Sequence, residues 1–145
     1  MKIARIGAAG SEKPVVVDGD QAIDVSSLVS DWNRTELEKG GYEKVAKADL
    51  SKLPRTSLAG VRYGSPVARP TKVICVGLNY IGHIAETGAD TPKEPVIFMK
   101  APDSVIGPND DIVIPPNSAA TDYEVELAII IGKSALYLDS PADSA

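Results

Sequence analysis

Short apolar stretches alternate with turn-forming residues over the first part of the chain. Residues 2–6 alternate polar and apolar side chains, which predicts an edge strand because successive residues of a strand point to opposite faces. Two further apolar stretches, residues 15–17 and 22–25, flank the turn sequence Asp18-Gly19-Asp20. This arrangement is typical of two short strands joined by a tight turn.

Two helices are expected after these strands. Ser26 or Ser27 is expected to cap a helix that runs to about Lys39, because a serine hydroxyl accepts hydrogen bonds from the free N–H groups of a first turn. The glycine pair that follows would end this helix. A second short helix is expected around residues 42–48. The first part of the chain is therefore predicted to be a small α+β unit.

The pattern changes after residue 50. Residues 51–71 are rich in Ser, Pro, Gly and Arg, which predicts an irregular linker. From Lys72 onward, apolar runs predict a β-rich region that contains one short helix at residues 80–87. The expected strands cover residues 73–76, 96–99, 112–114 and 122–131. The predicted fold class is α+β, with an N-terminal α+β domain and linker over residues 1–65 and a β-rich domain over residues 66–145.

Composition narrows the function classes. The 145 residues are 43% hydrophobic and 24% charged, which is typical of a globular chain with a core. The net charge of −5 argues against nucleic acid as the main partner, since phosphate binding needs a basic surface. Cys75 is the only cysteine, so no internal disulfide forms. No window approaches 18 consecutive apolar residues, and a soluble cytoplasmic protein without membrane contact is expected.

Negative charge is concentrated in the second half of the chain, and two of the carboxylates there lie two residues apart on a predicted strand. Residues 71–145 hold 4 Lys and Arg against 11 Asp and Glu. In a strand over residues 122–131, Glu124 and Glu126 would share one face roughly 7 Å apart. Such carboxylates repel each other when buried, and a divalent cation between them removes that repulsion. The alternative is an exposed acidic patch at the start of the strand.

The same predicted strand is apolar on both faces after Glu126. Leu127, Ile129, Ile130 and Ile131 would therefore need cover on both sides. Without that cover they would lie partly on the surface, where they would favour association.

Two further features carry candidate chemistry. His83, the only histidine, lies three residues before Glu86, so that a helix would place both on one face. A carboxylate beside an imidazole raises its basicity, and such a pair can take a proton from water. Lys100 closes the apolar strand over residues 96–99 and could hold an anionic oxygen. The alternatives are a surface His–Glu pair without a task and a solvated strand end.

The stretch from Lys72 to Lys133 resembles the fumarylacetoacetate hydrolase family. Five short pieces appear in the order that the family shows. They are Val76-Gly77-Leu78-Asn79-Tyr80, His83 with Glu86, Pro95-Val96-Ile97-Phe98-Met99-Lys100, Ile106-Gly107-Pro108, and Asp122-Tyr123-Glu124-Val125-Glu126-Leu127. Residues 1–50 resemble, less specifically, the variable domain that precedes the catalytic part in bacterial members.

The resemblance implies a metal-dependent hydrolase. It implies a Mg²⁺ or Mn²⁺ ion on Glu124 and Glu126, water activation by His83 and Glu86, and contact of Lys100 with the substrate or an oxyanion. Asn79 and Tyr80 are implied as further substrate-binding residues. The implied fold of residues 66–145 is the first part of a mixed, β-rich roll, commonly in a homodimer. The implied substrates are small 2-oxo or 1,3-diketo acids of the acylpyruvate or diketo-deoxy sugar acid type.

Several alternatives stay open at this point. The same family contains decarboxylases, hydratases and ureidoglycolate-type lyases, and the residues do not separate these from C–C hydrolysis. Members carry a third metal ligand, an aspartate, on a later strand, and Asp139 and Asp143 do not match its motif. The chain is therefore expected to be the front portion of a longer enzyme, inactive when expressed alone. The alternative outside the enzymes is a catalytically silent fragment or interaction module.

Overall fold

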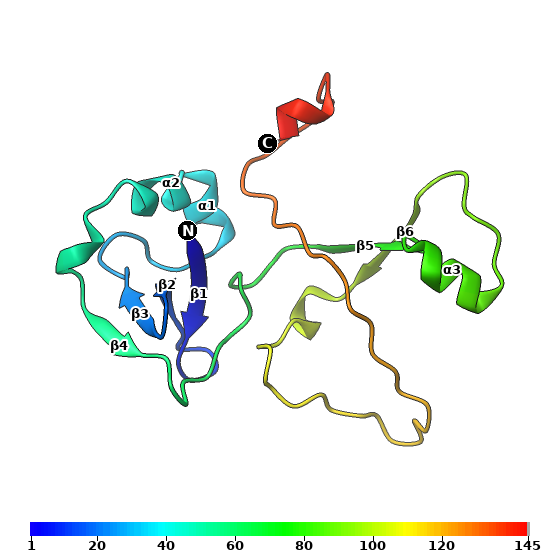
Figure 1. The fold of residues 1–145 in the computed structure, drawn as a ribbon, viewed down its shortest axis with the longest axis horizontal. Coiled ribbons are helices and arrows are strands. Elements are labelled where there is room, and N and C mark those ends of the chain that lie inside the picture. The colour runs from blue at the N-terminus through cyan, green and yellow to red at the C-terminus, as the bar shows by residue number, and fades with distance from the viewer. Residues whose placement is uncertain (145) are drawn as a thin grey trace. The chain divides into compact units, whose positions relative to one another are not determined.

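The computed structural model describes residues 1–144 as a chain of mixed helix and strand (Figure 1). Two compact units form, one from residues 1–68 together with those from 107 onward, the other from residues 69–106. The strands are β1 Lys2–Ile6, β2 Lys13–Asp18, β3 Gln21–Asp24, β4 Arg55–Ser57, β5 Val73–Gly77 and β6 Val96–Lys100. The α-helices are α1 Arg34–Glu38, α2 Gly41–Ala46 and α3 Ile81–Thr87, and the 3₁₀ turns are η1 Leu50–Lys52, η2 Pro102–Ser104 and η3 Pro141–Ser144.

The first unit is built on a four-stranded antiparallel sheet in the order β1-β2-β3-β4. The predicted strands at residues 2–6, 15–17 and 22–25 are confirmed as β1, β2 and β3. Gly19 has a φ of +61° in the turn between β2 and β3, a conformation that glycine adopts without a steric penalty. Strand β4 lies within the stretch predicted as an irregular linker, so that prediction is wrong for residues 55–57. Its Thr56 pairs with Ala22 of β3.

Both faces of this sheet are covered. One cluster gathers around Trp32, which is fully buried, and its indole Nε1 donates a hydrogen bond to the Val15 carbonyl oxygen at 3.3 Å. The buried members of that cluster are Val16, Ile23, Val25, Val29, Trp32 and Val45. A smaller cluster of Ala4, Val15 and Ala22 lies on the other face. Burial on both faces explains why β2 reads as three consecutive valines.

The helix predicted from Ser26 or Ser27 to Lys39 is wrong. Only residues 34–38 form α1, and the cap is Asn33, whose side chain accepts a hydrogen bond from the Glu36 N–H at 3.0 Å. The preceding residues form turns that carry Val29 and Trp32 into the core. Tertiary burial of the indole thus overrides the local preference for helix. The short second helix is confirmed as α2, slightly shifted from residues 42–48.

A network of charged side chains joins distant parts of the first unit. Arg5, which is only 8% exposed, binds Asp31 through its Nε at 2.7 Å and Glu12 through its Nη2 at 3.2 Å. Arg62 binds the other oxygen of Glu12 at 2.9 Å and donates to both oxygens of Asp110. Hydrogen bonds from Arg62 hold the pKa values of Glu12 and Asp110 below the usual range. The buried guanidinium of Arg5 and the half-buried guanidinium of Arg62 are therefore both matched by carboxylates, as removal of charge from water requires.

The second unit is a two-stranded antiparallel sheet with one helix between its strands. Strands β5 and β6 pair from Val73 opposite Lys100 to Gly77 opposite Val96, which confirms both predicted strands. Helix α3 confirms the helix predicted over residues 80–87, and Gly88 ends it in the left-handed conformation with φ +66°. Between β5 and α3, Leu78 has a φ of +51°. A branched side chain rarely adopts this conformation, so the turn is strained.

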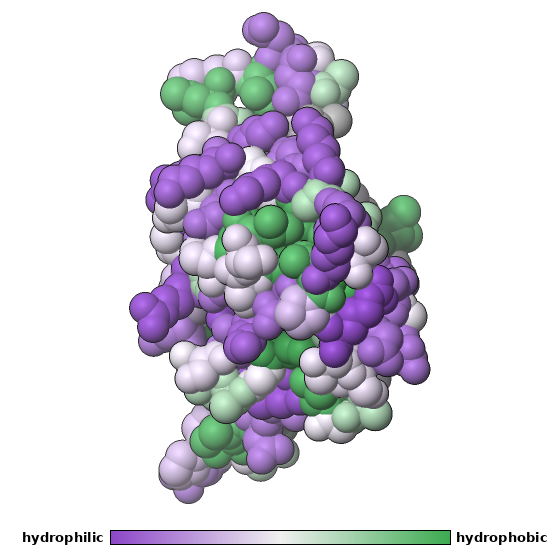
Figure 2. Space-filling view, turned by 90° about the vertical axis from the view of Figure 1, so that its left-hand side faces the viewer, coloured by the Kyte–Doolittle hydropathy of each residue, from purple (hydrophilic) through white to green (hydrophobic). Residues whose placement is uncertain are grey.

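The strands predicted at residues 112–114 and 122–131 are wrong, because neither segment has regular secondary structure. A strand is defined by its ladder of hydrogen bonds, and no strand pairs with these segments among residues 1–144. Leu127, Ile129 and Ile131 are 81%, 79% and 76% exposed, as expected for apolar side chains without cover. The face shown in Figure 2 is mainly hydrophilic, with smaller hydrophobic areas between the hydrophilic ones.

None of the helices in the described part of the chain is long and apolar enough to cross a membrane.

Acid should weaken the first unit through its charged network. The pKa values of Glu12 and Asp110 are lowered from ordinary values of 4.5 and 3.8, so the unfolded chain binds protons first as the pH falls. Their contribution is complete above about pH 5 and is lost as the pH falls through the lowered folded-state values. The thermal midpoint, followed through the NMR signal of the Trp32 indole N–H, should be level to about pH 5 and drop below pH 4. Asp110→Asn should reduce this drop and Asp111→Asn should leave it unchanged. A level midpoint down to pH 3 would contradict this.

The strain at Leu78 predicts an inverted order of stabilities. Leu78→Gly should be more stable than Leu78→Ala by about 1 kcal/mol, because only glycine lacks the penalty at positive φ. Gly82 within α3 supplies the control, since a Cβ added there meets nothing within 4 Å. Gly82→Ala should stabilise α3 by roughly 0.5–1 kcal/mol. Amide hydrogen exchange of residues 81–87 in the full-length gene product measures both. Equal stability of the Gly and Ala variants at position 78 would show that the left-handed turn is not adopted.

Candidate functional site

Helix α3 brings His83 and Glu86 together. Their spacing of three residues places both on one face, and His83 Nδ1 lies 3.9 Å from Glu86 Oε2. This separation is too long for a hydrogen bond and suits an ion pair when the imidazole is protonated. Both side chains face solvent, at 51% and 83% exposure, while Ile84 holds the helix to its unit from the buried side. The pair is therefore accessible to a ligand or to water.

The strained turn before α3 carries the two other candidate ligand-binding residues of this segment. Asn79 and Tyr80 follow Leu78 directly, and Tyr80 occupies the N-cap position with an extended backbone. Both side chains are exposed, Tyr80 at 45%. The chain bends at Leu78, where φ is positive, and Asn79 and Tyr80 directly precede the first turn of the helix that carries His83.

Lys100 ends β6, as the sequence predicts, and is exposed. Its rung partner is Val73, whereas Gly77, which leads into α3, pairs with Val96 at the other end of the ladder. Four residue steps separate the two rungs, roughly 13–14 Å along the strand. Lys100 and the residues that follow Gly77 thus start from opposite ends of one hairpin.

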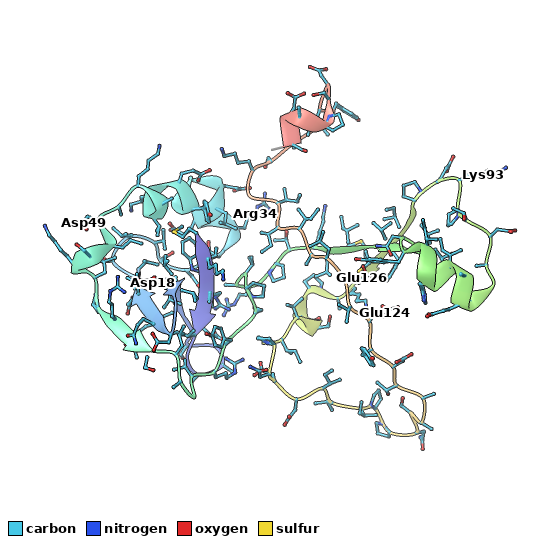
Figure 3. All side chains as sticks on the ribbon, viewed as in Figure 1. Asp18, Arg34, Asp49, Lys93, Glu124 and Glu126 are labelled. Atoms are coloured by element: carbon cyan, nitrogen blue, oxygen red, sulfur yellow. The ribbon has the colours of Figure 1, made fainter. Side chains whose placement is uncertain are left out.

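Glu124 and Glu126 lie on the extended segment that leads toward η3 (Figure 3). Both are exposed, and they belong to the first unit, whereas His83, Glu86 and Lys100 belong to the second. The segment lacks the expected strand, so the alternation that would place both carboxylates on one face is not imposed by a ladder. Asp122 fixes the backbone just before them by accepting a hydrogen bond from the Tyr123 N–H at 2.8 Å.

The donor chemistry of this pair fits a hard divalent cation in part. Carboxylate oxygens are the ligands that Mg²⁺ and Mn²⁺ prefer, and Mg²⁺ is commonly held by one or two carboxylates with water completing its shell. Among residues 1–144, no group of three or more His, Cys, Asp or Glu side chains is arranged to hold a metal ion. Glu124 and Glu126 can therefore supply two ligands, and further ligands must come from water, substrate or other protein groups.

Sequence reasoning missed the residues of the charged network. Arg62 and Asp110 lie 48 positions apart and meet through a two-bonded contact, with Arg62 Nε to Asp110 Oδ1 at 2.7 Å. The pKa of Arg62 is raised, first by its hydrogen bonds with Asp110 and then by those with Glu12. The one local sign of the network is Arg5, because a charged residue in the predicted strand β1 needs carboxylate partners if it is buried. Its side chain is buried in the structure.

Comparisons with known proteins show which family the chain is similar to. The family profile described as "Fumarylacetoacetate (FAA) hydrolase C-terminal" matches residues 72–145. A 2,4-didehydro-3-deoxy-L-rhamnonate hydrolase from a Sphingomonas species is 40% identical over 139 residues, 95% of this chain and 47% of the relative. The chain spans about half the length of the curated relatives it matches.

Solved structures are similar to this chain in fold. Maleylpyruvate hydrolase from Sphingobium sp. SYK-6, solved with manganese(II) and pyruvate, matches with a TM-score of 0.59 and 28% identity over 80% of this chain and 43% of that one. Fumarylacetoacetate hydrolase from Exiguobacterium antarcticum matches with a TM-score of 0.53 and 33% identity over 73% of this chain and 37% of that one.

The five short pieces that resemble the family all fall within residues 72–145, the part that the family profile covers. Relatives that align with nearly the whole chain carry the name hydrolase. On these grounds the chain belongs to the fumarylacetoacetate hydrolase family.

Proposed function

We propose that the full-length gene product is a divalent-metal-dependent hydrolase that cleaves a C–C bond in a small 2-oxo or 1,3-diketo acid. The observation that carries this proposal is the Glu124-Val125-Glu126 sequence within the part of the chain that the family profile covers. A relative named for hydrolysis of a diketo-deoxy sugar acid and a structural neighbour solved with pyruvate support the substrate class. The names of these relatives favour hydrolysis over decarboxylation, hydration or a ureidoglycolate-type lyase reaction.

In this proposal Glu124 and Glu126 hold Mg²⁺ or Mn²⁺. Both are exposed oxygen donors two residues apart, and a structural neighbour in the family is solved with manganese. When bound, such an ion polarises a substrate carbonyl and stabilises the enolate that leaves. Adjacent oxygens of a 2-oxo acid can supply ligands that the chain does not, which matches the incomplete ligand set of the described residues.

The second unit supplies proton transfer. His83 is proposed to take a proton from a water molecule while the water oxygen forms a bond to the substrate's carbonyl carbon. Glu86, whose Oε2 lies 3.9 Å from His83 Nδ1, stabilises the imidazolium that results. The C–C bond then breaks, one fragment leaves as a carboxylic acid, and the other leaves as an enolate that accepts a proton from the imidazolium. The overall change adds one water across one C–C bond.

The remaining candidate residues bind the substrate in this proposal. Lys100 carries a positive charge at the exposed end of β6 and would pair with a substrate carboxylate or a developing oxyanion. Asn79 and Tyr80 would contact substrate oxygens next to His83. The proposed partner is thus a small anionic acid, with neither nucleic acid nor membrane involved. Residues 66–145 would form the first part of a β-rich roll in a homodimer, which would cover the exposed apolar side chains of residues 127–131.

Metal binding should depend on Glu126. Mn²⁺ at about 100 times its dissociation constant should stabilise the full-length gene product by about 2.7 kcal/mol, since the ion binds the folded state. Glu126→Gln removes one carboxylate and should abolish most of this gain. Glu94→Gln, at an exposed position of the second unit, is the matched control and should respond like the wild type. Thermal unfolding with and without Mn²⁺ measures the effect. An equal response of wild type and Glu126→Gln would refute the assignment.

Loss of the proposed base should affect turnover rather than metal binding. His83→Ala should lower kcat for an acylpyruvate by about 10²–10⁴, because proton transfer is needed only in the transition state. The Mn²⁺-induced stabilisation should stay at the wild-type level. Gly82→Ala, next to it on α3, should retain turnover. Steady-state assays of pyruvate release test this, and a kcat within threefold of wild type in His83→Ala would exclude His83 as the base.

A further inference from the structure

Arg62 contacts two segments of the first unit, one that precedes the second unit in the chain and one that follows it. Its Nε and Nη2 bind the two oxygens of Asp110 at 2.7 Å and 2.5 Å. Its Nη1 binds Glu12 Oε1 at 2.9 Å and the Gly7 carbonyl oxygen at 3.0 Å. The guanidinium is 29% exposed and the two carboxylates 8% and 24%. The paired, two-bonded geometry restricts both partners far more than a single contact does.

The chain leaves the first unit close to this arginine. Gly64 N–H donates to the Arg5 carbonyl oxygen at 2.8 Å, and Ala68 N–H donates to the Trp32 carbonyl oxygen at 2.7 Å. The Arg5 guanidinium also binds Ser65. The last residues before the second unit are therefore tied to strand β1 and to the core tryptophan.

The chain returns at the same place. Gly107 is buried, and a Cβ added to it would collide with the carbonyl oxygen of Tyr63, the residue after Arg62. Its N–H donates to Asp110 Oδ2 at 2.8 Å, so one carboxylate holds both Gly107 and Arg62. The Ile106-Gly107-Pro108 piece thus contains a glycine because the returning chain passes directly against residue 63.

We infer that Arg62 and Asp110 form an anchor that holds the two ends of residues 69–106 together and restrains the orientation of that unit. This inference rests on the proposed function where it concerns turnover. The unit carries His83 and Glu86, whereas Glu124 and Glu126 follow Asp110 on the returning chain. Arg62 and Asp110 are then positioning residues, because proton transfer needs the base within bonding reach of water beside the metal.

Other surface ion pairs of the first unit lack these properties. Arg55 of β4 and Asp18 of β2 are 41% and 59% exposed, and both belong to one sheet. Lys133 and Glu43 are 74% and 49% exposed and meet at 3.5 Å. Exposed pairs of this kind restrain little. Arg55→Lys is therefore the matched control for Arg62→Lys, and Asp111→Asn, next to the anchor and exposed, is the control for Asp110→Asn.

The test measures orientation and turnover separately in the full-length gene product. The native cysteines are first replaced, Cys75→Ala among them. Spin labels are then attached at Lys52→Cys and Lys93→Cys, and pulsed electron paramagnetic resonance measures the distance between the two labels. Both positions are exposed, one in each unit. Asp110→Asn and Arg62→Lys should at least double the width of the distance distribution, while Asp111→Asn and Arg55→Lys leave it unchanged. The two anchor variants should lower kcat about tenfold or more, with the Mn²⁺ dissociation constant within twofold of wild type.

Two results overturn the inference. One is a distance distribution in Asp110→Asn and Arg62→Lys as narrow as in their controls. The other is a broadened distribution with unchanged kcat, which would show that orientation does not limit turnover. If Asp110→Asn fails to fold, the result with Arg62→Lys decides between the outcomes. That variant keeps the positive charge and loses the two-bonded contact with Asp110. A wild-type protein without metal-dependent turnover would refute the proposed function, and the distance distributions would still decide whether the anchor exists.

Discussion

Two arginines that are largely withdrawn from water organise the first unit. Arg5 and Arg62 cannot lose their charge, so their burial is tolerable only where carboxylates meet them. Glu12 lies between the two guanidinium groups and accepts from both, while Asp31 and Asp110 complete the set at the two ends. These contacts draw the β1–β2 connection, the segment before Trp32 and the returning chain to one place. Asp31 directly precedes the buried Trp32, and Arg62 and Asp110 flank the two ends of the second unit in the chain.

The proposed chemistry is divided between the two units. The proposed base, His83, and its partner Glu86 lie on the short helix α3, which follows the strained turn at Leu78. Glu124 and Glu126 lie on an extended segment of the first unit. Each set is exposed, and among the described residues no group of three or more His, Cys, Asp or Glu side chains is arranged to hold a metal ion. Hydrolysis of a diketo acid needs both an electrophile and a base at one carbonyl group. In the proposed function the contact between Arg62 and Asp110 has a role because it holds together the two ends of the segment that carries His83 and Glu86.

Sequence patterns predicted the elements whose stability is local or comes from near neighbours. The hairpin of β2 and β3, strands β5 and β6, and helix α3 were all expected, and the spacing of His83 and Glu86 correctly placed them on one helix face. The failures have physical causes. Residues 26–32 follow the burial of Trp32 rather than helix propensity, and residues 122–131 find no strand with which to pair within the described chain. The contact of Arg62 with Asp110 joins positions too far apart for any local pattern to reveal.

The proposed function depends most on Glu124 and Glu126, as the metal ligands of a hydrolase acting on 2-oxo acids. A crystal structure of the full-length gene product with Mn²⁺ and pyruvate, with data collected at the manganese absorption edge, tests it directly. We expect an anomalous peak within about 2.3 Å of an oxygen of each glutamate, with pyruvate oxygens completing the ligand shell. A manganese peak bound to other residues, with both glutamates turned away from it, would show that they are not the metal ligands.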